Sequence, residues 1–332
     1  MKILHVPTEI AGQMQTLVSG LRESGHTVNG YNWFHTYLKY GGGIINTDAY
    51  ELKNVMEALI RYADLIHFHN GNSFLIHNTD LPILHQIGKK MVMHHWGNDV
   101  RSRSGALLRN PYPIPPSYLT DESIHKRLLH LSCYIQHSIV QDYELYPYVS
   151  DYYRHVHVLP LACRVTDIPC SYPSPANRNP VIIHAPTNRL FKGSEYIEKA
   201  IKDLIGVHPF HYKAIEKMSH QEAMRMYAAS DIIIDQILCG TYGMLSVEAM
   251  AMGKVVVAFI RDDVKVKFPK ELPIVIANPD TIRDVLGRLI KDPELRHRIG
   301  IESRKYAESL HDVKVVIPKL LNIYKQIERT EV

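Results

Sequence analysis

Short apolar runs alternate along the chain with longer segments in which apolar residues recur every three to four positions. The clearest case lies in the last third of the chain. Its two ends, Ile232–Ile234 and Val255–Ile260, are rich in β-branched residues and short enough for buried strands. Between them, Leu245, Ala249 and Met252 recur at helical spacing. The pattern therefore predicts two parallel strands joined by a helix.

The loop before this helix carries the first candidate chemistry. Gly240 and Gly243 precede the helix and Gly253 follows it, as start and stop signals do. A loop that leaves the carboxyl end of a parallel strand presents backbone N–H groups, and the helix dipole favours an anion there. Glu248, one turn into the helix, would repel a phosphate, so its expected partner is a neutral diol such as ribose. An ordinary loop with a solvated glutamate is the alternative.

A second predicted strand, Val181–Ile183, leads into another loop with candidate chemistry. This loop carries Arg189, Lys192 and Gly193 before a periodic helix. Two cations and a glycine in a strand-to-helix loop can neutralise a diphosphate. Two solvated surface cations are the alternative.

Strands and helices alternate through the rest of the chain as well. Further strands are expected at the N-terminus and in His26–Tyr31, Asp64–His69, Lys90–His95, Cys133–His137, Val156–Leu159 and Phe210–Ile215. Further helices are expected in Tyr50–Tyr62, Leu81–Ile87, Asp121–Leu131, Asp142–Val149 and Asp312–Ile327, and after the capping box of Ser219 and Glu222. Such alternation is typical of an α/β protein with doubly wound parallel sheets.

Two histidine pairs lie at the carboxyl ends of predicted strands, where ligand crevices form in such sheets. On a strand, His67 and His69 share one face, whereas His94 and His95 face opposite sides. Histidine pairs also ligate zinc. The sequence contains no HExxH motif and no third ligand at a suitable spacing, so a metal site is the less favoured alternative.

Length and charge narrow the class of protein. With 332 residues, of which 45% are hydrophobic, the chain is most simply two domains. A net charge of +4 and a pI near 8.7 are too mildly basic to indicate nucleic acid, and no run of Lys and Arg interleaved with aromatic residues occurs.

Cysteines and apolar segments bear on the compartment. The four cysteines are scattered without a CxxC pair, which indicates a reducing, cytoplasmic location rather than a disulfide framework. Pro7 interrupts the short N-terminal apolar run, so no signal peptide is expected, and no apolar stretch reaches the length of about 18 residues needed for a membrane span. Arg101, Arg103 and Arg109 leave peripheral membrane contact open, with a solvated loop as the simpler interpretation.

The loops NRLFKG and GTYGMLSVEAMAMGKVVV resemble the nucleotide-sugar half of GT-B glycosyltransferases, in particular the large retaining family four of cell-envelope and natural-product enzymes. The resemblance implies that Arg189 and Lys192 hold the donor diphosphate and that Glu248 binds the ribose. The helix N-terminus at Gly243, Met244 and Leu245 then contributes to diphosphate binding. The loop from Ile215 to Met218 corresponds to the segment that contacts the base through backbone groups.

The segments HFHNGNS and HHWGNDVR resemble the acceptor half of the same family, where HFHFG precedes a segment like FHGSDIR. The active-site histidine of the family comes from this strand end, so His94 and His95 are both candidates for catalysis. Gly12, Asp99, Gly240 and Tyr242 are expected on the donor-sugar and acceptor side. One departure is Gly240, because the family often has a glutamate at this position.

The predicted boundaries are a first Rossmann-like domain in residues 1–165, a linker in 166–179, a nucleotide-sugar domain in 180–310 and a helix in 311–332. The resemblance to GT-B enzymes implies that this helix crosses back to the first domain. The GT-B resemblance implies that the two domains face each other across a cleft.

The resemblance implies transfer of a sugar, with retention, from a nucleotide-diphosphate sugar such as a UDP-sugar to a hydroxyl acceptor. No metal and no cofactor are expected, because Arg189, Lys192 and the helix N-terminus can neutralise the leaving group. Retention without an evident nucleophile favours front-face attack. A nucleotide-sugar epimerase and an inactive partner protein are the alternatives.

Overall fold

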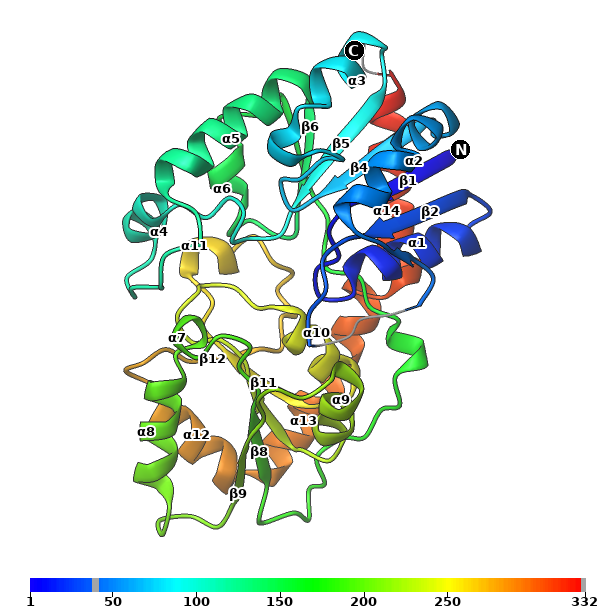
Figure 1. The fold of residues 1–332 in the computed structure, drawn as a ribbon. Coiled ribbons are helices and arrows are strands. Elements are labelled where there is room, and N and C mark those ends of the chain that lie inside the picture. Colours follow the sequence, from blue (N-terminus) through cyan, green and yellow to red (C-terminus); the bar gives the residue numbers. More distant parts are fainter. Residues whose placement is uncertain (38–41, 330–332) are drawn as a thin grey trace. The chain divides into compact units, whose positions relative to one another are not determined.

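The computed structural model describes residues 1–37 and 42–329, which form two compact units (Figure 1). Unit 1 comprises Met1–Ala106, Pro116–Ala162 and the C-terminal segment from Val313. Unit 2 comprises Leu107–Pro115 and Cys163–Asp312. Both units are therefore assembled from segments that are distant in the sequence.

In the described part of unit 1, seven parallel strands form one sheet in the order β3-β2-β1-β4-β5-β6-β7. The strands are β1 Lys2–Val6, β2 Thr27–Asn32, β3 Ile45–Asn46, β4 Leu65–His69, β5 Lys90–His95, β6 His137–Val140 and β7 His155–Val158. The helices are α1 Gln13–Glu23, α2 Ala49–Tyr62, α3 Leu81–Gln86, α5 Asp121–Tyr134, α6 Tyr146–Val149 and α14 Val313–Arg329, while α4 Arg103–Arg109 begins here.

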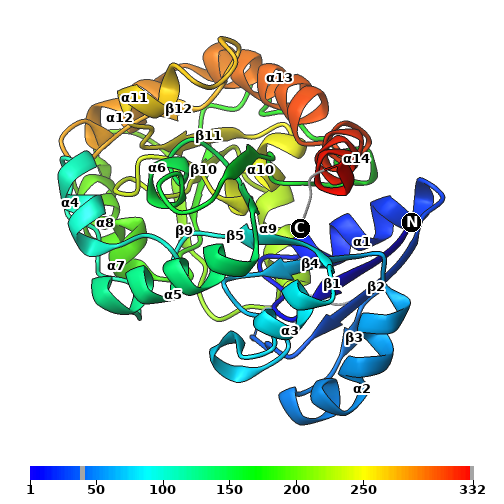
Figure 2. The same ribbon diagram turned by 90° about the horizontal axis from the view of Figure 1, so that it is seen from above.

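In the central strands of this sheet, alternate residues pack against different helices. Ile3 belongs to the core formed with α1 and α14, whereas Leu4 belongs to the core formed with α2, α3 and α5. The same alternation separates Leu65 from Ile66 on β4. Helices α1 and α14 lie side by side in both views (Figures 1 and 2). Period-two alternation thus sends successive buried residues of β1 and β4 into two different cores.

In unit 2, the described residues form a five-stranded parallel sheet in the order β12-β11-β10-β8-β9. The strands are β8 Val181–His184, β9 His211–Ala214, β10 Ile232–Ile234, β11 Val255–Ala258 and β12 Val275–Ile276. The helices are α7 Arg189–Lys192, α8 Ser194–Leu204, α9 His220–Ala228, α10 Met244–Ala251, α11 Asp262–Lys265, α12 Ile282–Lys291 and α13 Pro293–Leu310. The apolar sides of α8 and α12 share a core with Ile182, Ile232 and Val255.

The strand orders place a topological switch point in each sheet. In unit 1 the chain proceeds outward in opposite directions from β1 and β4, and in unit 2 from β8 and β10. Crevices that bind ligands form at the carboxyl ends of such strand pairs. The prediction of an α/β protein with doubly wound parallel sheets is confirmed.

Two local predictions were wrong. The strand expected in Cys133–His137 begins only at His137, because α5 continues to Tyr134 on a stripe that includes Leu128 and Leu131. The helix expected in Asp142–Val149 is reduced to α6, because the Asp142 carboxylate accepts the amides of Glu144 and Leu145 and holds a turn instead.

The segment 166–179, expected as a linker, is hydrogen-bonded to unit 2. Lys254 Nζ donates to the carbonyl of Ser171 at 2.6 Å, and the buried Arg296 guanidinium donates to the carbonyl of Asn177. The proline-rich segment Leu107–Pro115 also belongs to unit 2, where Asn110 Nδ2 donates to the carbonyl of Leu238 at 2.7 Å. These bonds assign both segments to unit 2.

Gly20 provides a test of the contact between α1 and α14. A Cβ at Gly20 would lie 2.6 Å from Val313 Cγ2 and 2.7 Å from Ile317 Cγ1. Gly20→Ala should destabilise unit 1 by about 1 to 3 kcal/mol through overpacking, against a gain of up to about 1 kcal/mol in helix propensity. Gly287→Ala is the matched control in α12, because its Cβ would make an ordinary 3.6 Å contact with Leu204. Chemical denaturation should show that Gly20→Ala lowers the free energy of unfolding and that Gly287→Ala raises it. If both changes raise it, α1 and α14 are not closely packed at Gly20.

Candidate active site

Asp235, directly after β10, joins two of the predicted donor-site elements. Its carboxylate forms an ion pair with Lys192 and accepts hydrogen bonds from the amide of Gly243 at 3.1 Å and from Ser246 Oγ at 2.7 Å. Burial alone raises the pKa of Asp235, but the Lys192 charge and these hydrogen bonds hold the pKa below its ordinary value. Lys192 and the start of α10 thus meet at one buried carboxylate. The signal in the sequence was an acidic residue at a strand end.

Local structure fixes both partners of Asp235. Lys192 ends the one-turn helix α7, which Asn188 caps by accepting the amide of Phe191 at 3.1 Å. Gly243 caps α10, which begins at Met244. The amide of Gly243, expected to bind a phosphate, is already bonded to Asp235. The amide of Leu245 has no hydrogen-bond partner in the described part of the chain, so it is the donor that remains for an anion.

Arg189 begins α7 and is paired differently. Its guanidinium contacts Glu198 at 2.7 Å and Glu216 at 2.5 Å, and 45% of its side chain is exposed. A diphosphate at Arg189 must therefore compete with two carboxylates. The structure places both predicted cations on the loop after β8, but only Lys192 points to the start of α10.

Glu248 is nearly buried, with 5% exposed, and its Oε1 lies 2.6 Å from His220 Nε2. His220 is the first residue of α9, whose capping box between Ser219 and Glu222 is confirmed. Burial lowers the pKa of His220, but the hydrogen bond and charge of Glu248 outweigh this and raise the pKa above its ordinary value. Sequence reasoning missed His220, although the predicted capping box fixed where its helix begins.

The loop expected to contact the base follows β9. Ile215 is buried, and its amide donates to the carbonyl of His184 at 2.9 Å, which extends the pairing of β8 and β9. That amide is therefore unavailable to a ligand. Met218 lies half-buried just before the cap of α9.

Gly240 and Tyr242 occupy constrained positions in the loop before α10. Gly240 has φ +91°, and a Cβ there would lie 2.5 Å from Arg261 Cγ. A glutamate at this position is excluded unless the backbone and Arg261 both move. Tyr242 is buried, and its hydroxyl is hydrogen-bonded to His311 Nε2 at 3.0 Å. Neither residue presents a polar side-chain atom without a partner.

In unit 1, Gly12 caps α1 in the left-handed conformation, with φ 76°. The buried carboxylate of Glu9 accepts the amides of Met14 at 3.1 Å and Gln15 at 2.8 Å. Burial raises the pKa of Glu9 to about 7, and the amide hydrogen bonds offset this only in part. A protein carboxylate that sequence reasoning missed therefore fills the helix start near Gly12.

His95 is held on the α5 side of the sheet. Its Nδ1 lies 2.7 Å from Asp99 Oδ2 and its Nε2 lies 2.9 Å from Tyr153 Oη. Asp99 also accepts the amides of Trp96 and Gly97. Burial raises the pKa of Asp99, but His95 and Arg127 keep the pKa below its ordinary value. Both nitrogens of His95 are occupied, so the pair organises the loop after β5.

His94 points to the opposite face, as the alternation predicts. Its Nδ1 lies 3.2 Å from His67 Nε2, and its ring stacks on Trp96 with centroids 3.8 Å apart. Its Nε2 is buried and has no partner in the described part of the chain. The sequence left His94 and His95 equal, whereas the structure leaves only His94 with a nitrogen for a ligand.

His5 of β1 joins this face and was not predicted, because only the pairing of β1 with β4 brings it beside His67. Among the described residues, His5, His67 and His69 offer nitrogens within 4.8 Å of one another, which resembles a metal site. However, the rings of His67 and His69 stack at 5° with centroids 4.5 Å apart. Imidazole binds a metal in its ring plane, so parallel stacked rings do not direct their lone pairs at one ion. The geometry favours hydrogen bonding.

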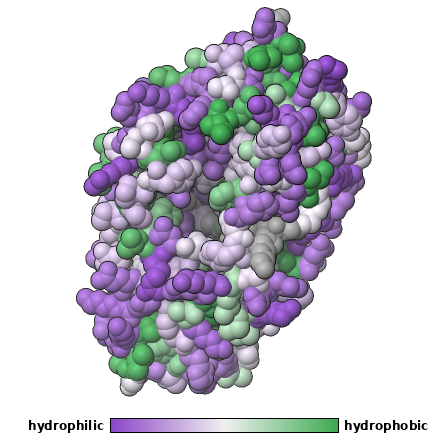
Figure 3. Space-filling model, in the orientation of Figure 1, coloured by the Kyte–Doolittle hydropathy of each residue, from purple (hydrophilic) through white to green (hydrophobic). Residues whose placement is uncertain are grey.

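The arginines considered for membrane contact differ in exposure. Arg101 is buried and forms a bidentate ion pair with Glu144 at 2.6 and 3.1 Å, so it is not available to lipid. Leu107 and Leu108 of α4 are exposed. In the view of Figure 3, hydrophilic residues predominate and apolar residues lie in separate small groups. None of the described helices is long and apolar enough to cross a bilayer, and peripheral contact through Arg103 and Arg109 stays a prediction.

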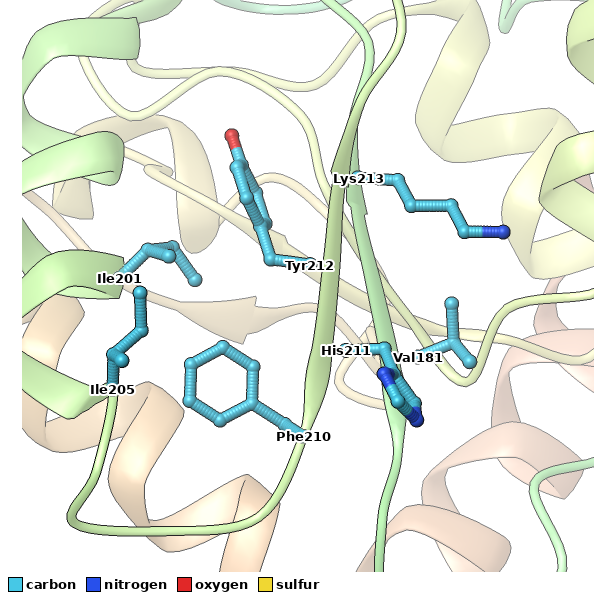
Figure 4. A pocket seen from close by; sticks show the side chains of 7 residues that line it. All are labelled: Val181, Ile201, Ile205, Phe210, His211, Tyr212 and Lys213. Carbon is cyan, nitrogen blue, oxygen red and sulfur yellow. The ribbon is translucent and has the colours of Figure 1, made fainter.

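One surface pocket lies away from these residues, around edge strand β9 (Figure 4). Phe210 and Tyr212 point toward Ile201 of α8, whereas His211 and Lys213 lie on the other side of the strand. These residues are near the amino ends of β8 and β9, opposite to the strand ends that carry the candidate site. The pocket is not part of that site.

No protein-family model and no curated protein sequence matches this chain. Solved structures do match it. Anabaena Alr3699/HepE in complex with UDP and glucose has a TM-score of 0.68 and 11% identity, over 98% of this chain and 100% of that chain. The chain has the GT-B fold. A glycosyltransferase from Rickettsia africae has a TM-score of 0.66 and 14% identity over 99% of both chains.

A third structure similar to this chain is sucrose-phosphate synthase from Thermosynechococcus elongatus. Its TM-score is 0.65 and its identity 13%, over 98% of this chain and 99% of that chain. At such identities the likeness establishes the fold. Within this GT-B fold, the candidate residues belong to separate units, with His94 in unit 1 and Lys192 and Glu248 in unit 2.

The raised pKa of His220 makes the stability of unit 2 depend on pH. The ion pair with Glu248 contributes fully below the unfolded pKa of about 6.5, and the contribution is lost as pH rises through the higher folded pKa. Wild type should therefore exceed His220→Gln in stability by on the order of 1 kcal/mol at pH 6, and the gap should narrow toward pH 9. Thermal unfolding of both proteins from pH 6 to pH 9 measures this difference in stability. His208→Gln is the control and should show no such dependence on pH. A gap that widens with pH would contradict the assignment.

Proposed function

We propose that this chain transfers a sugar from a nucleoside-diphosphate sugar, a UDP-sugar, to a hydroxyl acceptor. The observation that carries the proposal is the convergence of Lys192 and the start of α10 on Asp235, at the switch point between β8 and β10. A diphosphate at the unpartnered amide of Leu245 lies beside the Lys192 ammonium and at the positive end of the α10 dipole.

The leaving diphosphate is stabilised by these groups as charge develops on it. Lys192 supplies a compact charge that is already oriented by Asp235, and Arg189 adds a second charge when it exchanges a carboxylate for phosphate. No metal ion is required in this scheme. Glu248 binds the ribose hydroxyls through its carboxylate, with His220 holding that carboxylate in place.

On the acceptor side, the unpartnered Nε2 of His94 is the group proposed to contact a reacting hydroxyl. Retention by front-face attack, membership of retaining family four and a hexose donor are part of the proposal and rest on the sequence resemblance. The matched Anabaena structure contains UDP and glucose, which supports the choice of a UDP-sugar.

A thermal-shift screen of UDP, GDP, ADP and TDP tests the proposal. A nucleotide at 100 times its Kd adds about 2.7 kcal/mol to the stability of the folded protein. Stabilisation by UDP above the other nucleotides is expected. No stabilisation by any of them favours the inactive partner protein, and turnover of a UDP-sugar to an epimer without acceptor favours the epimerase.

Lys192 should matter more to diphosphate binding than Arg189. Lys192→Ala removes a cation and exposes the charge of Asp235, whereas Arg189→Ala removes a cation already offset by Glu198 and Glu216. Lys192→Ala should weaken UDP at least about tenfold, since charge-assisted bonds contribute about 1.5 to 3 kcal/mol, and should leave uridine nearly unchanged. Calorimetric titration measures both ligands. Equal losses for UDP and uridine would sink the diphosphate assignment.

The ribose assignment is tested at Glu248. Glu248→Gln keeps the shape but weakens the acceptor, so UDP should bind at least about tenfold less tightly, a loss of about 1.4 kcal/mol. The 2′,3′-dideoxy analogue lacks both hydroxyls and should bind poorly to either form. Glu294→Gln, the same change at an exposed glutamate in the first turn of α13, serves as the matched control and should leave the binding of both nucleotides unchanged. If Glu248→Gln weakens both nucleotides alike, Glu248 has a structural role only.

A further inference from the structure

A continuous hydrogen-bonded chain of side chains crosses the α1 and α14 face of the unit 1 sheet. His69 Nε2 lies 3.0 Å from His5 Nδ1, and His5 Nε2 lies 3.2 Å from Tyr324 Oη. The same oxygen lies 2.6 Å from His67 Nδ1, and His67 Nε2 lies 3.2 Å from His94 Nδ1. The two ends, His69 Nδ1 and His94 Nε2, are buried and have no partner among the described residues.

Strand register builds this chain. His5 is paired with His67 across β1 and β4, and His69 with His94 across β4 and β5, so the four rings share one face. Tyr324 enters from the buried stripe of α14 and bridges His5 and His67. Residues from the first and last elements of the sequence therefore complete one network.

All five groups are neutral. Burial, with a smaller effect of Arg22, lowers the pKa of His5 to about 3, and burial lowers the pKa of His67, His69 and His94 well below the ordinary value. Burial also raises the pKa of Tyr324 well above its ordinary value. Two further titratable neighbours, His95 and Asp99, leave all five groups neutral.

His95 and Asp99 both act on His94. His95 lowers the pKa of His94 further, and Asp99 raises the pKa of His94 to a smaller extent. Each of the five groups in the chain therefore carries one exchangeable proton.

One proton per group leaves two arrangements for the whole chain. Every link needs one donor and one acceptor. If His69 donates from Nε2 to His5, then His5 must donate from Nε2 to Tyr324, Tyr324 to His67, and His67 from Nε2 to His94. In the reverse arrangement all four histidines carry the proton on Nδ1. Mixed states leave a link with two protons or with none, or they make His5 and His67 both donate to Tyr324 and leave its buried hydroxyl proton without a partner, which is costly.

We infer that His5, His67, His69 and Tyr324 are positioning residues that couple their tautomers to that of His94 and so set which of its nitrogens carries the proton. The relevance to the reaction rests on the proposed function of His94. A hydroxyl that donates to His94 Nε2 requires the Nδ1–H arrangement throughout, and a group that accepts from it requires the Nε2–H arrangement. His69 Nδ1 always has the opposite role to His94 Nε2.

Tautomers of the four histidines test the coupling without any substrate. ¹⁵N-histidine NMR of the full-length, ligand-free protein distinguishes Nδ1–H, Nε2–H and imidazolium. The expected result is one common tautomer for His5, His67, His69 and His94, neutral from pH 5.5 to 8. Two different tautomers among the four, or titration of any of them in this range, would overturn the inference.

Tyr324→Phe breaks the central link. The lone pairs of His5 Nε2 and His67 Nδ1 should then face the phenyl ring, because a buried N–H without a partner is the costlier state. The His5 and His69 pair should become Nδ1–H, and the His67 and His94 pair Nε2–H.

Tyr153→Phe is the matched control for Tyr324→Phe. It removes a buried Tyr–His hydrogen bond, the one to His95 on the other face of the sheet. The common tautomer should survive this change. A common tautomer that persists in folded Tyr324→Phe overturns the coupling.

Two further measurements separate the inference from its alternatives. One equivalent of Zn²⁺ should leave the resonances of His5, His67 and His69 in place, and stoichiometric binding there would replace the coupled chain with a metal site.

In an active enzyme, Tyr324→Phe should lower kcat at least fivefold with the donor KM unchanged. Absence of transfer by the wild type refutes the proposed function and leaves the tautomer test intact, whereas split tautomers in an active wild type refute the coupling alone.

Discussion

The alternation of side chains across a parallel sheet is the constraint on which the candidate site depends. Adjacent residues such as His94 and His95 must enter different cores, and residues two apart such as His67 and His69 must share one. The side chains on each face of the sheet then determine which histidine nitrogens are already hydrogen-bonded within the protein. One face supplies Asp99 and Tyr153 to occupy both nitrogens of His95, whereas on the other face the hydrogen bonds among the described residues join imidazoles and Tyr324.

Protein carboxylates already occupy two helix starts at the switch points. Asp235 accepts the amide of Gly243 before α10, and Glu9 accepts amides in the first turn of α1. Their environments differ, since Lys192 neutralises Asp235 while Glu9 lacks a comparable cation among the hydrogen bonds and ion pairs of the described residues and has a raised pKa. The helix start that retains an unpartnered amide, at Leu245, is thus the one with a cation beside it.

The sequence predicted most strands, the two parallel sheets and the loops that carry Lys192, Glu248 and His94, because hydrophobic period and glycine placement are local signals. It did not predict the partners of these residues. Asp235, His220 and His5 lie far in sequence from the residues they contact, and only strand order and register bring them together. The helix predicted for Asp142–Val149 is shorter in the structure for a different reason, namely that the side chain of Asp142 binds backbone amides that the helix would need.

Arg261 gives the glycine at position 240 a wider meaning. Its aliphatic stem fills the space where a side chain at 240 would lie, and its amide donates to the carbonyl of Gly240 at 3.0 Å. The two positions therefore constrain each other, so that a glutamate at 240 and an arginine at 261 are mutually exclusive on this backbone. A substitution at 240 alone therefore reports strain, and a test of the role proposed for position 240 has to change Arg261 and relieve the positive φ as well.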